Sequence, residues 1–203
     1  VASKKAELER LRSGADFAAT VAALRWHDGF GESAPEVLAG EAEALELRKQ
    51  QMVAEGKRAM RALLESGGAR EVTAALSKYA GEMAAEAPAE HAELQAHAMT
   101  MISGVRAEVS SFLASLDPDA ADPGDIAALI EVCSMFEDGA MAEESAALTD
   151  AQSAVVDRAQ TTLRLVATST DQANLKGAIE RFTSASFEDA TVVALLAAAR
   201  ERL

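Results

Sequence analysis

Histidines are the first side chains to examine for chemistry, because their ring nitrogens bind metals and exchange protons near neutral pH. The chain has three, His27, His91 and His97. A zinc-binding pair on a helix needs a spacing of four residues, whereas His91 and His97 are six apart and point about 120° away from each other. Glu93 and His97 have the required spacing, but two ligands without a third make no site. We therefore interpret the histidines as solvated or bonded within their own helices, and expect no metal.

An aspartate-rich segment, residues 117–125, could suggest a calcium loop. Such a loop needs glycine at its sixth position and a bidentate glutamate at its twelfth. With Asp117 as first ligand, these positions hold Asp122 and Ala128, and the fifth holds Ala121. The pattern fails at three positions. We interpret the segment as a turn whose acids cap the next helix.

The single cysteine, Cys133, excludes an intramolecular disulfide and a thiolate metal cluster within one chain. It occupies an apolar helical position where equivalent segments hold Leu24, Tyr79 and Phe182. We therefore predict that it is a small buried hydrophobe and not a nucleophile. No strand-to-helix glycine loop for phosphate is present, so we expect no cofactor.

Carboxylates are the remaining groups that could meet a partner, and they are unevenly distributed. Residues 1–66 carry ten Lys/Arg and eleven Asp/Glu, whereas the rest of the chain carries nine and twenty-two, which gives the net charge of −14. Between Arg106 and Arg158 there is no basic side chain, while twelve acids occur. Such a surface repels nucleic acid and anionic lipid. It suits a basic protein partner, or serves solubility alone.

Within this acidic region we place a candidate partner-binding surface where carboxylates cluster around a predicted helix start. It comprises Glu137, Asp138, Glu143, Glu144 and Asp150. Nothing in the spacing of these residues marks a catalytic pair, because acids at a helix start also serve as caps.

The elements that would position these residues follow a pattern that occurs four times. Apolar residues at offsets 0, 3, 4 and 7 mark one face of a helix. The four stripes begin at residues 17, 72, 126 and 175, so they are 49 to 55 residues apart. In front of them stand Asp16, Glu71, Asp125 and Asn174; we expect the first, third and fourth to be N-caps and Glu71 to lie in a first turn. The stripe residues are Phe17, Thr20, Val21 and Leu24; Val72, Ala75, Leu76 and Tyr79; Ile126, Leu129, Ile130 and Cys133; and Leu175, Ala178, Ile179 and Phe182.

Each stripe belongs to a predicted short helix, which a longer helix follows. The short helices are expected at about 16–28, 70–83, 125–137 and 172–183, and the first long helix at 34–66. The fold class predicted is all-α, an α-solenoid-like array of four helical hairpins with a period of about 50–55 residues. Its units are 14–67, 68–117, 118–170 and 171–203, within one domain. Beyond the stripes, the predicted core comprises Leu38, Leu45, Met52, Leu63, Leu94, Ile102, Val105, Phe112, Leu148, Val155, Leu163, Leu195 and Leu196.

The ends and composition place the chain in a broad class. Residues 1–13 read as the tail of a preceding helix, and the last helix stops about halfway, so we expect a piece of a longer array. No apolar run approaches the roughly 18 residues that would cross a membrane, and the polar N-terminus is no secretory signal. The single cysteine favours an intracellular setting, with cytoplasm, cytoskeleton or cilium, and organelle lumen left open.

Three functions remain open from the sequence. The first is a non-catalytic scaffold that mediates protein–protein interactions with other chains of a larger complex. The second is an acidic helical-repeat module that binds a basic protein or peptide. The third is an enzyme with a helical-bundle pocket, which no group of residues in the sequence supports.

Overall fold

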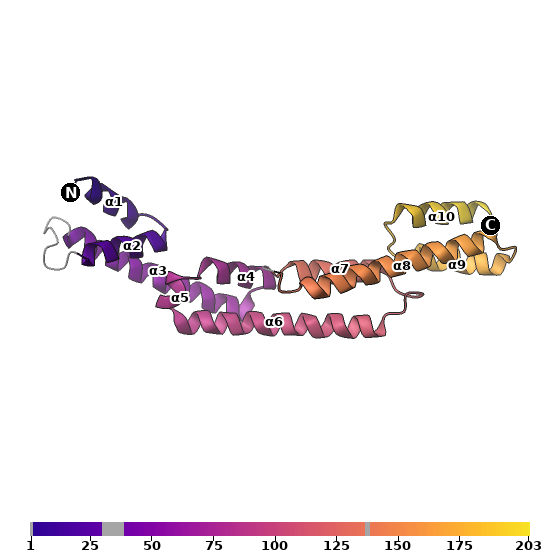
Figure 1. Cartoon of the computed structure of the whole chain (residues 1–203), viewed down its shortest axis with the longest axis horizontal. Coiled ribbons are helices and arrows are strands. Elements are labelled where there is room, and N and C mark those ends of the chain that lie inside the picture. The colour runs from indigo at the N-terminus through magenta and orange to yellow at the C-terminus, as the bar shows by residue number, and fades with distance from the viewer. Residues whose placement is uncertain (1, 30–38, 137–138) are drawn as a thin grey trace. The chain divides into compact units, whose positions relative to one another are not determined.

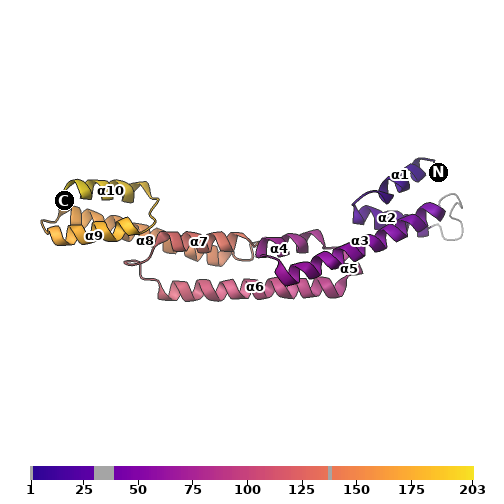
Figure 2. The ribbon, with the colours of Figure 1, turned by 180° about the vertical axis from the view of Figure 1, so that it is seen from behind.

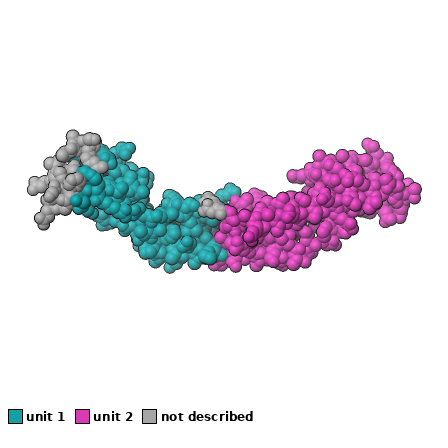
Figure 3. All heavy atoms as spheres, viewed as in Figure 1, with its two compact units in different colours: residues 1–99 teal, residues 100–203 magenta. Residues whose placement is uncertain are grey.

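The computed structural model describes residues 2–29, 39–136 and 139–203, and all regular structure within these ranges is helical. The predicted all-α class is confirmed. Abundant alanine and leucine, both strong helix formers, explain why the described residues form helices. The chain divides into two compact units, residues 1–99 and 100–203 (Figure 3). The finer division into four hairpin units stays a prediction.

In the first unit, α3 is the helix that contacts most of the others. The helices of this unit are α1 (Ala2–Arg12), α2 (Phe17–Asp28), α3 (Ala39–Ser66), α4 (Ala69–Lys78), α5 (Glu82–Glu86) and the first part of α6 (Pro88–Ser115) (Figure 1). Both α1 and α2 lie along the N-terminal half of α3, and α4 and α5 contact it further along (Figure 2). The first contact buries Leu8, Leu11, Ala23, Leu24 and Leu45 in one apolar cluster.

In the second unit, α8 has the corresponding role. The unit contains the rest of α6, α7 (Pro123–Ser134), α8 (Ala142–Thr168), α9 (Gln172–Ser184) and α10 (Ala190–Glu201). The helices α7, α9 and α10 all contact α8 (Figures 1 and 2). One apolar cluster joins the last three helices: Ala159, Leu163, Ala178, Phe182, Val192 and Leu196.

The predicted stripes face the interior, with few exceptions. Eleven of their sixteen residues are buried and the other five, Phe17, Leu76, Tyr79, Leu129 and Ile130, are half-buried. Of the additional core residues, Leu63, Ile102, Val105, Phe112 and Leu195 are also half-buried, and Leu38 lies outside the described residues. Buried residues outside the predicted core include Leu8, Leu11, Met60, Val109 and Val192.

Two helix N-caps differ from the prediction. Asp16 caps α2 as expected, with its carboxylate accepting the Ala19 amide at 2.9 Å. The caps of α7 and α9, however, are Asp122 and Asp171, three residues before the expected Asp125 and Asn174. The physical reason is that in both helices the first three residues come before the apolar stripe. These residues belong to the first helical turn without being part of the stripe, so the stripe does not reveal them. The apolar pattern therefore marks where burial begins, which is later than where the helix begins.

The second short helix, expected as one piece over 70–83, is broken into α4 and α5. Gly81 has φ 67°, in the left-handed region that favours glycine, and it lies immediately before α5. The chain changes direction at this residue, between α4 and α5. As a result Met83, which follows the turn, is directed at α3.

Candidate functional site

The predicted acidic surface is only partly brought together by the structure. Glu137 and Asp138 lie outside the described residues. Glu143 and Glu144 occupy the first turn of α8, where negative side chains interact favourably with the helix dipole. Asp150 lies farther along that helix. Glu143 and Asp150 are exposed, whereas the Glu144 side chain is only 17% exposed.

Glu144 is held in place by an arginine of α6. Arg106 Nε donates to Glu144 Oε1 at 2.8 Å, and Arg106 Nη2 donates to the carbonyl oxygen of Ala140 at 2.9 Å. Glu144 Oε2 is buried and has no hydrogen-bond partner among the described residues. This carboxylate therefore fixes α8 to α6 within the second unit, and among the described residues Glu143, Glu144 and Asp150 it is the least available to a partner.

Cys133 lies close enough to Glu144 to feel its charge. The thiol is buried, as predicted, and burial raises its pKa, with the Glu144 carboxylate adding to the effect. Both causes favour the neutral thiol, which is the less nucleophilic form. The side chain serves as a core residue of α7.

The aspartate-rich segment is tied to the rest of the second unit by hydrogen bonds. Arg158 Nε donates to Asp119 Oδ1 at 2.8 Å and its Nη2 to Oδ2 at 3.0 Å; this hydrogen bonding lowers the pKa of Asp119. Asp122 Oδ1 accepts the amides of Gly124 and Ser186, both at 2.9 Å. Over residues 2–29, 39–136 and 139–203, no three His, Cys, Asp or Glu side chains come together as a metal site.

Charge in the second unit is strongly unbalanced at the surface. Each of its seven Lys and Arg residues forms an ion pair or a hydrogen bond. Its seventeen Asp and Glu residues far exceed them. The exposed carboxylates that form no ion pair within the described part of this unit are Glu108, Asp117, Asp125, Glu131, Glu143, Asp150, Asp157, Asp171, Glu188 and Glu201.

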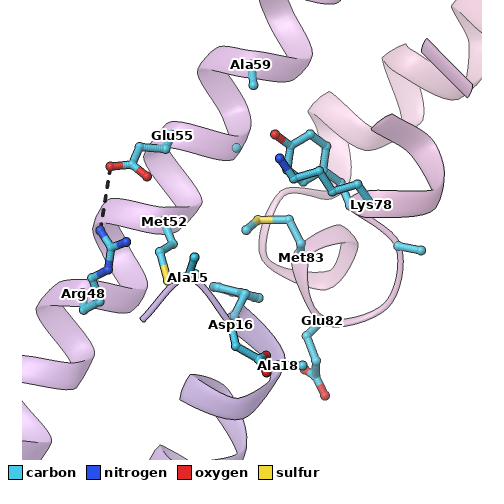
Figure 4. Close-up of a pocket in the computed structure, with 14 residues that line it drawn as sticks. Ala15, Asp16, Ala18, Arg48, Met52, Glu55, Ala59, Lys78, Glu82 and Met83 are labelled. Atoms are coloured by element: carbon cyan, nitrogen blue, oxygen red, sulfur yellow. Dashed lines mark ion pairs between the residues drawn. The ribbon is translucent and has the colours of Figure 1, made fainter. Parts of the chain in front are cut away.

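The first unit contains a cavity of about 550 Å³ that the sequence analysis did not anticipate. Three segments form it: the start of α2, the middle of α3 and the corner between α4 and α5 (Figure 4). Met52 of α3 and Met83 of α5 are buried and line it, and Tyr79 and Phe17 add aromatic surface. A cavity of this volume is within the range of small-molecule sites.

The signal for this cavity in the sequence was a pair of glycines. Gly56 is buried within α3, and a Cβ atom there would approach Met83 Sδ to 3.1 Å and Tyr79 Cε1 to 3.7 Å. The missing side chain lets these two residues lie against the α3 backbone. Gly81 supplies the turn that returns the chain to this point. Spacing alone could not show that the turn at Gly81 brings Met83 against Gly56.

No protein-family model, curated protein or solved structure matches this chain. The interpretation of its surfaces therefore depends on their geometry and charge. Among the helices of the described residues, none combines the length and the apolar character needed to cross a membrane.

Proposed function

We propose that the chain is a non-catalytic scaffold, a four-hairpin array that binds other protein chains within a larger assembly. The observation that supports this most directly is the outward face of the long helices. Each of α3, α6 and α8 carries one large aliphatic side chain that is mostly in solvent: Leu47 at 57% exposed, Met99 at 70% and Leu165 at 67%.

These side chains contrast with their near neighbours on the same helices. Leu45 is 1% exposed and Leu163 is 0% exposed, although each lies two residues from an exposed leucine. One face of each helix therefore packs in its unit while another remains uncovered. Covering a large aliphatic side chain contributes about 1.5–3 kcal/mol to association. Isolated exposed leucines are common in proteins; recurrence on each long helix is what supports a binding role.

The test is the size of the native particle that contains the chain. We expect the tagged chain, sedimented from its own cells under native conditions, to migrate in a particle well above 21.2 kDa. A triple variant, Leu47→Glu, Met99→Glu and Leu165→Glu, should shift it toward the free chain with an unchanged circular dichroism spectrum.

A matched control places the same charges on the same helices. Ala54, Ala114 and Ala154 are exposed residues of α3, α6 and α8. Changing all three to glutamate should leave the particle intact. A wild-type chain that sediments as a free monomer, or equal effects of the two triple variants, would refute the scaffold proposal.

The second candidate, an acidic module for a basic protein or peptide, is favoured by the unpaired carboxylates of the second unit. Its test measures binding of a fluorescent arginine-rich peptide by anisotropy at about 50 mM and 300 mM salt, since such binding weakens as salt screens the charges. Changing Glu137, Glu143, Asp138 and Asp150 to their amides should weaken binding at least about tenfold, a loss of about 1.4 kcal/mol. Glu144 is left unchanged because it pairs with Arg106.

The control for the peptide experiment removes the same amount of charge elsewhere. Amide variants of Glu9, Glu43, Glu65 and Glu93, exposed residues of the first unit, change the net charge equally. If both quadruple variants weaken the peptide to the same degree, the attraction reflects net charge alone and the second unit contains no dedicated surface.

A further inference from the structure

We propose that the cavity of the first unit binds a small, uncharged aromatic molecule. The cavity lies between α2, α3 and the corner of α4 and α5, entirely within residues 15–83 (Figure 4). This activity is separate from the scaffold role, because none of the three exposed side chains of the long helices lines the cavity.

The apolar walls select the shape and polarisability of the occupant. Met52 and Met83 come from opposite sides of the cavity, one from α3 and one from α5 (Figure 4). Thioether sulfur atoms make favourable contacts with the edges of aromatic rings, and methionine adapts its rotamer to the ring that it meets. The Tyr79 ring adds a surface for edge-to-face packing. Together these groups favour a planar ring over a branched aliphatic ligand.

The charged residues around the cavity select against charge in the occupant, because each already has a partner. Arg48 Nη2 donates to the carbonyl oxygen of Gly14 at 3.3 Å, and its other terminal nitrogen lies 3.9 Å from Glu55. Glu82 accepts two hydrogen bonds of 2.7 Å from Arg25.

The remaining two charges are also engaged. Asp16 Oδ1 caps α2 through the Ala19 amide at 2.9 Å. The Lys78 ammonium lies 5.1 Å from the centre of the Tyr79 ring, a cation–π distance. A charged ligand would have to lose its own hydration and compete with these contacts for its counter-ion. An uncharged ring requires neither.

The absence of a side chain at Gly56 lets Met83 and Tyr79 line the cavity close to the α3 backbone. Without a side chain at this point, the α3 backbone itself forms part of the wall, and Met83 packs against it. Gly40 lies on the same helix, and a Cβ atom there would meet nothing within 4 Å. Of the two glycines of α3, Gly56 therefore allows close packing of side chains, whereas Gly40 faces open space.

The direct test uses indole as the probe and the protein's own methionines as reporters. With ¹³C-methyl-labelled methionine, titration with indole should shift the methyl signals of Met52 and Met83 saturably. The buried methyls of Met60 and Met141 should stay in place, because neither residue lines the cavity. Equal shifts of all seven methionines, or no saturable shift, would overturn the proposal.

The charge preference is tested with two analogues of the same ring. Indole-3-acetate carries a negative charge and tryptamine a positive one, and both should bind at least about tenfold more weakly than indole. If either analogue binds as tightly as indole, the assignment to an uncharged ligand is wrong.

Obstructing the cavity mouth completes the test. Ala18 and Ala80 line the cavity and are exposed, so a tryptophan at either position can block it without entering the core. Ala18→Trp and Ala80→Trp should each weaken indole binding at least about tenfold. Ala22→Trp, on the exposed side of α2 and outside the cavity lining, should not. Unaltered binding in both blocked variants would overturn the location, and an unshifted Met60 signal verifies their fold.

Discussion

Replacing Leu163 by alanine tests the packing of the second unit in the most direct way. Leu163 lies on α8, is 0% exposed, and packs in the cluster that joins α8 to α9 and α10. The change removes three carbon groups, worth about 0.8 kcal/mol each in lost burial, and leaves a cavity that adds about 1 kcal/mol. We therefore expect the free energy of unfolding to fall by about 3 to 4 kcal/mol.

The assay is equilibrium unfolding in urea followed by circular dichroism, with hydrogen exchange by mass spectrometry to locate the effect in α9 and α10. The control is Leu165→Ala, two residues along the same helix, where the side chain is exposed. It should change the free energy of unfolding by no more than about 0.5 kcal/mol. Equal losses for the two variants would refute the assignment of which α8 face is buried.

Three further predictions concern charge, backbone and capping. The pKa of Glu90 is lowered from 4.5 by its backbone hydrogen bond and by the Arg61 hydrogen bond of 2.7 Å. The ionised Glu90 therefore stabilises the fold above pH 4.5, and this contribution is lost as the pH falls through the lowered pKa of the folded state. Between about pH 6 and 3, the urea midpoint should decline less in Glu90→Gln than in the parent chain. Gly81→Ala should lower the free energy of unfolding by about 1 kcal/mol because Gly81 has a positive φ. Gly104 is exposed in the middle of α6, so Gly104→Ala should raise the free energy of unfolding by about 0.5–1 kcal/mol. Urea unfolding measures both. In the same assay, Asp122→Ala should lower the free energy of unfolding by about 1–2 kcal/mol, and Asp125→Ala by no more than about 0.5 kcal/mol. A larger loss for Asp125→Ala would show that Asp125 is the N-cap of α7.

The sequence by itself determined the helical class and most of the buried faces. Residues such as Leu175 and Phe182 recur with the period of a helix, and only one face of a helix can be removed from water. Cys133 was placed correctly for the same reason. The N-caps of α7 and α9 were missed because capping depends on single polar residues, Asp122 and Asp171, that precede the apolar pattern.

The tertiary structure alone decided which long-range groups meet. Leu163 and Leu165 are chemically identical, yet only one is covered, because α9 and α10 approach α8 from one side. Glu90 is buried, and it accepts a hydrogen bond from Arg61 of α3, 29 residues away in the chain. The cavity of the first unit arises in the same way: the turn at Gly81 brings Met83 against Gly56 of α3, 27 residues earlier in the chain. Local periodicity reports which face of a helix leaves water, whereas contacts between helices depend on where distant segments arrive.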